Sequence, residues 1–162
     1  SRPVCEYEAV RLDLTDAVAR KALFARTGAS SRSTLVITEG LLIYLSREQA
    51  GEIAADVHAA ESFRYWIIDI ASPRLLAIMN RSWGKSVQDG NAAFQFAPAE
   101  GTAFYATYGW KETQFRSSMD EARRLHREMR MAWLWRIMGL LYPAKTREEF
   151  RRMSGIVLME RV

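Results

Sequence analysis

The sequence has few residues that carry redox or metal chemistry: one cysteine, Cys5, and two histidines, His58 and His126, among 162 residues. A single cysteine excludes a disulfide within the chain and fits a reducing compartment, so we expect a cytoplasmic protein. The two histidines are far apart in the sequence, and no group of cysteines accompanies them. We therefore expect no metal site.

Long apolar runs are missing too. No stretch of 18 apolar residues, the length that predicts a membrane-spanning helix, occurs, and the sequence begins without the pattern of a secretory signal peptide. Apolar residues make up 49% and charged residues 26% of the chain, which is typical of a soluble globular protein. A length of 162 residues predicts one domain with a sizeable core.

The charge balance is mildly basic, with 23 basic and 19 acidic side chains and a net charge of +4. Part of the excess lies in an arginine-rich stretch that follows Ser118 and continues into the apolar run M-A-W-L-W-R-I-M-G-L-L-Y. A basic helix with aromatic residues can lie on a membrane or bind nucleic acid. A core-packed helix with solvent-facing arginines explains the same pattern and is the interpretation that we favour, so neither partner is expected.

The chain is organised around residues 34–45, T-L-V-I-T-E-G-L-L-I-Y-L. The continuous apolar run Leu35–Ile37, which includes the β-branched Val36 and Ile37, predicts a strand that is buried on both faces, as in parallel sheets. Gly40 then permits a turn that a side chain would resist. Ser46 and Gln49 have the spacing of a capping box, which predicts that a helix follows the apolar segment.

Glu39 comes directly after this strand. Ligands of open α/β sheets bind at the carboxyl ends of the strands, so the Glu39 carboxylate can bind an ammonium or hydroxyl group of a ligand. A solvated turn glutamate explains the same position. The next strand, expected at Phe63–Ile70, places Asp69 near the same edge, where it can face the ligand or, as we favour, cap the following helix together with Ser72.

The segment T-E-G-L-L-I-Y-L-S-R-E-Q, residues 38–49, resembles the signature of the leucine carboxyl methyltransferase-like family, because glutamate, glycine, tyrosine and capped helix fall in the same register. Members are class I O-methyltransferases that use S-adenosylmethionine (SAM) and have a Rossmann-like fold. The resemblance implies an α/β protein with a mostly parallel sheet and an antiparallel last strand. It also implies SAM as the cofactor and a small-molecule acceptor that is methylated on a carboxyl or hydroxyl group.

The resemblance further implies roles for individual residues. Asp13 and Leu14 match a pair that lies beside the adenine of SAM, and Glu39 would orient the methionine end. Taken without the resemblance, the Asp-Leu pair is ordinary chemistry of a helix start. Tyr44 is a candidate for contact with the acceptor, with helix packing as the alternative.

The segment from Ser72 to Gly109 is expected to be the least regular part of the chain, since prolines and glycines recur along it. In the resembled family an insertion at this place helps to form a lid over the substrate. Phe94 and Phe96, in N-A-A-F-Q-F-A-P, would then line an apolar acceptor pocket. A loop packed onto the core explains these aromatic residues equally well.

Further elements follow from local apolar patterns and caps. They are a short strand at Glu8–Leu12, a helix from its N-cap Thr15 to about Arg26, a helix from Arg47 to about Ala60, a strand at Lys111–Arg116, a helix from a capping box at Ser118–Glu121 to about Leu141, and a strand at Gly155–Val162. Ending on two strands fits the class I methyltransferase plan, in which the last strand runs antiparallel.

Two features of class I methyltransferases are not found. They are the glycine-rich turn after the first strand, which holds SAM, and the acidic residue after the second strand, which holds the ribose hydroxyls. The chain, residues 1–162, therefore resembles the C-terminal half of such an enzyme, and we expect it to be inactive alone. A non-catalytic binding or assembly module that retains half of the fold is the alternative.

The missing strands affect the expected sheet. Without them, the strand at Leu35–Ile37 carries unpaired N–H and C=O groups along one edge, which is a template for pairing with another chain. We therefore expect self-association, or a partner chain that carries the missing N-terminal half.

Overall fold

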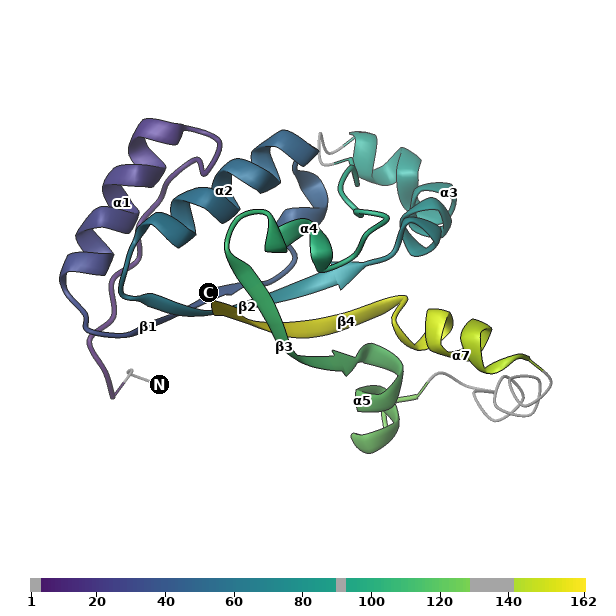
Figure 1. Cartoon of the computed structure of the whole chain (residues 1–162). Coiled ribbons are helices and arrows are strands. Elements are labelled where there is room, and N and C mark those ends of the chain that lie inside the picture. The colour runs from purple at the N-terminus through teal and green to yellow at the C-terminus, as the bar shows by residue number, and fades with distance from the viewer. Residues whose placement is uncertain (1–3, 90–92, 129–141) are drawn as a thin grey trace.

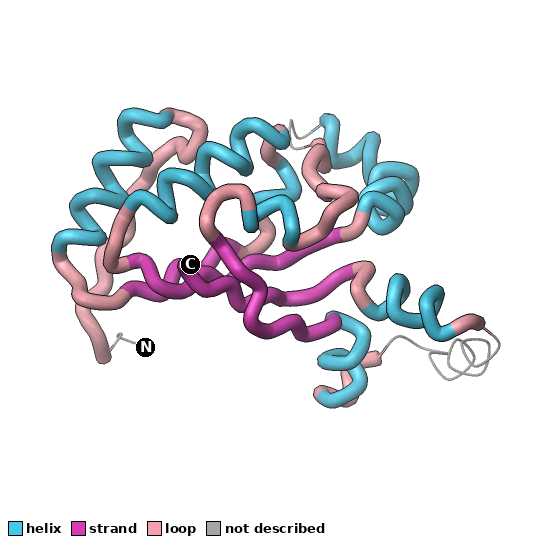
Figure 2. The backbone as a smooth tube through the Cα atoms, in the orientation of Figure 1, coloured by secondary structure: helices cyan, strands magenta, loops and turns pink. Residues whose placement is uncertain are grey.

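The computed structural model describes residues 4–89, 93–128 and 142–162, and it shows an α/β fold. Figures 1 and 2 show a four-stranded sheet with helices packed along it. The elements in chain order are α1 (Ala17–Ala29), β1 (Thr34–Thr38), the 3-10 helix η1 (Leu42–Tyr44), α2 (Arg47–Ala59), β2 (Phe63–Ala71), α3 (Pro73–Asp89), α4 (Ala103–Ala106), β3 (Trp110–Ser117), α5 (Ser118–Arg124), α7 (Ala144–Arg151) and β4 (Ser154–Arg161).

The sheet is mixed, with the strand order β1-β2-β4-β3. β1 and β2 are parallel and are joined by α2, so residues 34–71 form a βαβ unit. β4 lies between β2 and β3 and is antiparallel to both, which makes β3 run in the direction of β2. The antiparallel last strand is therefore confirmed. Three of the four strands run in one direction, although β1–β2 is the only parallel pair in the described part of the chain.

The local pattern that starts α2 is confirmed. Ser46 Oγ accepts the N–H of Gln49 at 3.2 Å, and the Gln49 side chain accepts the N–H of Ser46 at 2.8 Å. These two bonds satisfy backbone groups that the first helical turn leaves without partners. The ends of β2, β3 and β4 also lie within two residues of their predicted positions.

One face of the sheet packs against α1, α2 and α4, which lie on the same side of the strands (Figure 1). Trp66 of β2 is at the centre of this face and is fully buried. Its ring lies 5.4 Å from the rings of Tyr105 and Trp110, measured between centroids, and its Nε1 donates to Thr38 Oγ1 at 3.1 Å. Trp110 Nε1 donates to the carbonyl of Ala54 in α2 at 3.0 Å, which ties the sheet to the helix.

The opposite face of β1 is open. Leu35 is 49% and Ile37 61% exposed, whereas Val36, between them, packs against the core. The prediction that this strand is buried on both faces is therefore wrong. The helices that follow β1 and β2 along the chain do not cover this side, so an apolar strand has water on one face.

The structure corrects the predicted start of the chain. Residues Glu8–Leu12 form no strand. The N-cap of α1 is Asp16, whose carboxylate accepts the N–H groups of Val18 and Ala19, and not Thr15. Asp at an N-cap supplies the stronger acceptor and suits the helix dipole.

The segment Ser72–Gly109 is more regular than expected. It contains the 17-residue helix α3, and Ser72 Oγ accepts the N–H of Leu75 at its start. The cap is therefore Ser72 without Asp69, which corrects the favoured interpretation of Asp69. The later part of the segment packs onto the core through α4, where Phe104 and Tyr105 are buried. Whether any of it moves as a lid stays a prediction.

The helix predicted from Ser118 to Leu141 is wrong over its described part. α5 ends at Arg124, and His126 has a φ of 54°, a conformation that does not continue a helix. Its N-cap is Ser117, whose side chain makes no capping hydrogen bond, so the predicted capping box is also absent. Residues 129–141 lie outside the described residues.

Candidate functional site

The carboxyl ends of β1 and β2 bring two acidic residues together. Thr38 pairs with Ile68, so Glu39 and Asp69 are the next residues along the two parallel strands. The Asp69 carboxylate accepts the N–H of Gly40 at 3.0 Å and thereby holds the turn that follows β1. Glu39 is exposed, and no side chain of the described residues pairs with its carboxylate. Its carboxylate is thus available to a ligand at this edge.

The turn at Gly40 leaves space above the strand ends. Gly40 has a φ of 60°, which glycine adopts without the strain of a side chain. A Cβ built at this position would find no atom within 4 Å, so the turn borders open space. The backbone of Glu39 and Gly40 can therefore be approached closely by a bound molecule.

Tyr44 and Phe94, which lie fifty residues apart in the sequence, are neighbours in the structure. Their ring centroids are 5.4 Å apart, and Tyr44 is partly exposed. The Ile43 carbonyl accepts the N–H of Gln95 at 2.8 Å, and this bond holds the loop segment around Phe94 against η1. The pair forms an apolar surface, and its Tyr44 half lies five residues after Glu39 in the chain.

Phe96 lies elsewhere. It is 6% exposed and packs on Phe104, with 5.1 Å between ring centroids. It packs in the core, as the alternative of a loop packed onto the core predicts, and its place in an acceptor pocket with Phe94 stays a prediction.

Asp13 and Leu14 precede α1. Asp13 Oδ1 accepts the backbone N–H of Thr15 at 2.9 Å and its hydroxyl at 2.8 Å, and these two bonds hold the pKa of the Asp13 carboxyl below its ordinary value. Leu14 packs against the core, and its carbonyl accepts from Arg20 at 2.6 Å. These bonds belong to the turn and to α1, and no interaction found in the described residues joins Asp13 to Glu39 or Asp69.

A cavity of about 490 Å³ opens at the carboxyl end of β2, beside this edge. Its lining combines the end of β2 with the loop 98–102 and with Phe150 and Arg152 from the region before β4. This cavity was not predictable from the sequence, because its walls come from segments far apart in the chain. Two arginines of the cavity lining stack on aromatic rings. The Arg74 guanidinium lies 4.6 Å from the centroid of the Phe150 ring, and that of Arg152 lies 4.3 Å from the centroid of the Phe115 ring.

Glu112 fixes one wall of this cavity. Its carboxylate accepts two hydrogen bonds from Arg152, at 2.9 and 2.7 Å, and one from Thr102 Oγ1 at 2.5 Å. Burial raises the pKa of Glu112, but the bonds from Arg152 and Thr102 outweigh burial and hold the pKa below its ordinary value. The carboxylate is therefore ionised and keeps Arg152 in place.

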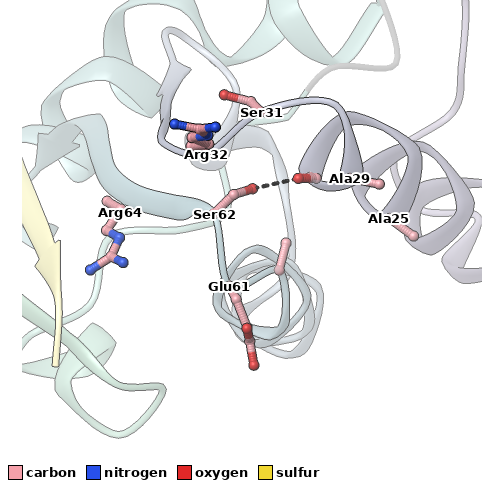
Figure 3. A pocket seen from close by; sticks show the side chains of 9 residues that line it. Ala25, Ala29, Ser31, Arg32, Glu61, Ser62 and Arg64 are labelled. Carbon is pink, nitrogen blue, oxygen red and sulfur yellow. Dashed lines mark hydrogen bonds between the residues drawn. The ribbon is translucent and has the colours of Figure 1, made fainter.

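A second cavity, of about 410 Å³, lies at the opposite edge, beside the amino ends of β1 and β2. Figure 3 shows Arg32, Arg64 and Glu61 around it, with the Ser62 hydroxyl bonded to the carbonyl of Gly28 at 2.9 Å. Ligands of α/β sheets bind at the carboxyl edge, so we do not assign the site here.

A metal-binding cluster and a membrane-spanning helix are both absent from the described residues. No group of three or more His, Cys, Asp or Glu side chains there is placed to hold a metal ion. Within the same residues, no helix combines the length and the apolar character that crossing a membrane requires.

Similarity of this chain to known proteins is found among solved structures. No family model matches the chain, and no curated protein matches it. The chain is similar to magnesium protoporphyrin IX methyltransferase from Synechocystis PCC 6803, a structure with bound SAH, at a TM-score of 0.45 and 16% sequence identity. The match covers 83% of this chain and 48% of that one, so this chain spans about half the length of the neighbour.

Proposed function

We propose that this chain is part of a SAM-dependent O-methyltransferase of the leucine carboxyl methyltransferase-like family, acting on a carboxyl or hydroxyl group of a small molecule in the cytoplasm. The observation that carries the proposal is the Glu39 carboxylate. It stands without a protein partner, within the described residues, at the carboxyl edge of the parallel pair β1–β2, beside an open glycine turn. This edge is where α/β sheets bind their ligands.

The residues present fit one part of the cofactor. Glu39 would accept hydrogen bonds from the ammonium of its methionine end, and Asp69 supports that contact by holding Gly40. Asp13 has a second carboxylate oxygen for the adenine amine, with Leu14 beside the ring, as the family resemblance implies. A G-x-G turn is not among these residues, since no two of the nine glycines are separated by a single position.

SAM, when bound, supplies an electrophilic methyl group. The chain's own contribution is to position the acceptor and exclude water, which are the main means by which a protein accelerates such a displacement. Tyr44 and Phe94 offer an apolar contact surface for the acceptor. The cavity at the end of β2 provides further room, with charged side chains that suit a polar group of the acceptor.

A non-catalytic binding or assembly module is the second candidate. The observation that favours it is the uncovered apolar face of the sheet, which a partner can cover. The two candidates differ in whether this chain binds SAM, and titration calorimetry with SAM separates them.

Glu39→Gln is the decisive variant. In the full-length enzyme of which we propose this chain to be part, we expect it to weaken SAM binding about ten-fold or more and to leave thermal stability nearly unchanged, because a hydrogen bond to a charged group contributes about 1.5–3 kcal/mol. Glu61→Gln is the matched control, since it makes the same change at the amino edge of the sheet and should leave the affinity unchanged. Equal affinity of Glu39→Gln and the wild type would refute the role of Glu39. No SAM binding by the wild-type chain would leave the module as the explanation.

A further inference from the structure

The cavity at the carboxyl end of β2 has walls from three parts of this chain. Its lining residues lie within 70–74, 98–102 and 149–153, so they join the start of α3, the loop before α4 and the segment from α7 to β4 (Figure 1). The cavity therefore lies where β2 ends and β4 begins, not at the β1 edge. Its volume of about 490 Å³ is within the range of small-molecule sites, about 300–1,000 Å³.

The cavity lining combines apolar and charged side chains. Ile70, Pro98, Phe150 and Met153 are among the apolar ones, and two arginines and two glutamates supply the charges. Apolar walls with a few polar groups are the usual composition of a site for a small organic molecule. The charged groups then decide which molecule fits.

Two of the four charged side chains of the lining are already paired. Arg152 and Glu100 each form an ion pair with a residue outside the lining. Arg74 and Glu149 are left, and neither side chain forms a hydrogen bond or an ion pair with any residue that the structure describes. These two groups are therefore the ones available to a ligand.

The charges around the lining do not compensate Arg74. The helix α7 carries three basic and two acidic side chains, so Glu149 does not make this wall acidic as a whole. Asp69, the residue before Ile70, lies outside the lining, and its carboxylate binds the turn that follows β1. Arg74 is thus a cation at the cavity without a carboxylate partner among the described residues.

Stacking holds the Arg74 guanidinium in place. It lies over the Phe150 ring, and Tyr142 contacts that ring in turn, with 5.9 Å between ring centroids. Stacking uses the face of the guanidinium and leaves its N–H groups, which lie in its plane, free to donate. A carboxylate accepts two such parallel bonds at once. Glu149 makes no contact of this kind, so Arg74 is the group positioned in advance for a ligand.

We propose that this cavity binds a small carboxylic acid with an apolar body, whose carboxylate pairs with Arg74 while the body packs against Phe150, Pro98 and Met153. The identification of this acid as the methyl acceptor rests on the proposed function, whereas the binding site itself does not. The carboxylate on Arg74 anchors the acid, because pairing with a guanidinium weakens a carboxylate as a nucleophile. The methylated oxygen then belongs to a second carboxyl or hydroxyl group of the same molecule.

The test is a titration of the whole chain with phenylacetate, followed by two-dimensional amide NMR spectra. The amide signals of Gly101, Thr102 and Met153, which line the cavity, should shift and saturate. A dissociation constant of about 1 mM is expected for a ligand of this size. Phenylacetamide has the same shape without the charge and should bind at least ten-fold more weakly, because it cannot form the charge-assisted bonds to Arg74.

Variants of the chain test the role of Arg74. Arg74→Met should weaken phenylacetate binding at least ten-fold. Arg81→Met is the matched control, because Arg81 lies about two turns later on α3, outside the lining, and its loss should leave the affinity unchanged. Glu149→Gln removes a charge of the same sign as the ligand and should tighten binding about two-fold.

Four results would overturn this inference. They are the absence of saturable shifts at the cavity amides, equal affinities for phenylacetate and phenylacetamide, equal affinities of Arg74→Met and Arg81→Met, and a loss in Glu149→Gln as large as that in Arg74→Met. The outcome is separate from that of the SAM titration. SAM binding without phenylacetate binding would refute the cavity site and leave the proposed function standing. Phenylacetate binding through Arg74 without SAM binding would keep the site and remove its role in methyl transfer.

Discussion

The two faces of the sheet are built from the same strands but meet different surroundings. In β2, Trp66 and Ile68 are fully buried under the helices, while Tyr65, between Arg64 and Trp66, faces water. In β1, Val36 packs on the core and Ile37 does not. Both faces have apolar side chains, so hydrophobicity alone does not decide which face is covered. The side on which the crossover helix α2 packs decides it.

This difference should appear most strongly in adjacent residues of β2. Trp66→Ala removes a fully buried indole, its hydrogen bond to Thr38 and two ring contacts, and should lower the free energy of unfolding by about 3–5 kcal/mol. Tyr65→Ala, on the open face, should lower it by less than about 1 kcal/mol for the monomer. Urea unfolding of dilute protein measures both.

Trp66→Ala can fail to fold, since the whole stability of a domain is about 5–15 kcal/mol. Trp66→Phe then gives the same comparison with a smaller loss, because an aromatic ring remains. A loss for Tyr65→Ala equal to that for the tryptophan variant would contradict the distinction between the faces.

The covering layer on the buried side depends on Arg20 of α1. Its side chain is 1% exposed and donates to Asp56 of α2, with Nε at 2.8 Å from Oδ2, and to the Leu14 carbonyl. Arg20→Met leaves Asp56 in a largely buried place without this partner, so we expect a loss of about 3 kcal/mol. Lys21 Nζ, at 3.8 Å from Asp56, limits the loss.

Arg26→Met on the same helix is the control for Arg20→Met. Arg26 pairs with Glu8, and both side chains are more than half exposed. Such a surface pair contributes about 0–1 kcal/mol, so thermal unfolding should change little. Equal destabilisation by the two variants would show that the buried Arg20 pair contributes no more to the free energy of unfolding than the exposed Arg26 pair does.

The smallest expected effect concerns Glu112, on the side of β3 that carries Trp110. Its pKa is lowered in the folded protein, so the stabilisation is present above the ordinary value of 4.5 and is lost as the pH falls through the lowered value. Glu112→Gln should therefore destabilise the protein at pH 7 and make less difference at pH 3. Melting curves at several pH values test this. Arg152→Met removes the main donor and should flatten the same pH dependence.

Much of the candidate site was predictable because it is local. The strand before Glu39, the turn at Gly40 and the capping box at Ser46 all follow from residues within a few positions of one another. Tyr44, Phe94 and Phe96 were predicted to contact the acceptor, but the sequence did not predict that Tyr44 packs on Phe94 while Phe96 lies in the core. The cavity at the end of β2 was not predictable, because its walls meet only after folding.

The sequence by itself determined strands β1 to β4, the capped start of α2 and the acidic turn, because backbone conformation responds to neighbouring side chains. Only the tertiary structure decided where long-range partners lie. The Asp69 carboxylate accepts the N–H of Gly40, 29 residues away, whereas Ser72 caps α3. Leu35 and Ile37 are exposed because the helices pack on the other side, and an apolar pattern specifies that a face needs a cover without specifying which element supplies it.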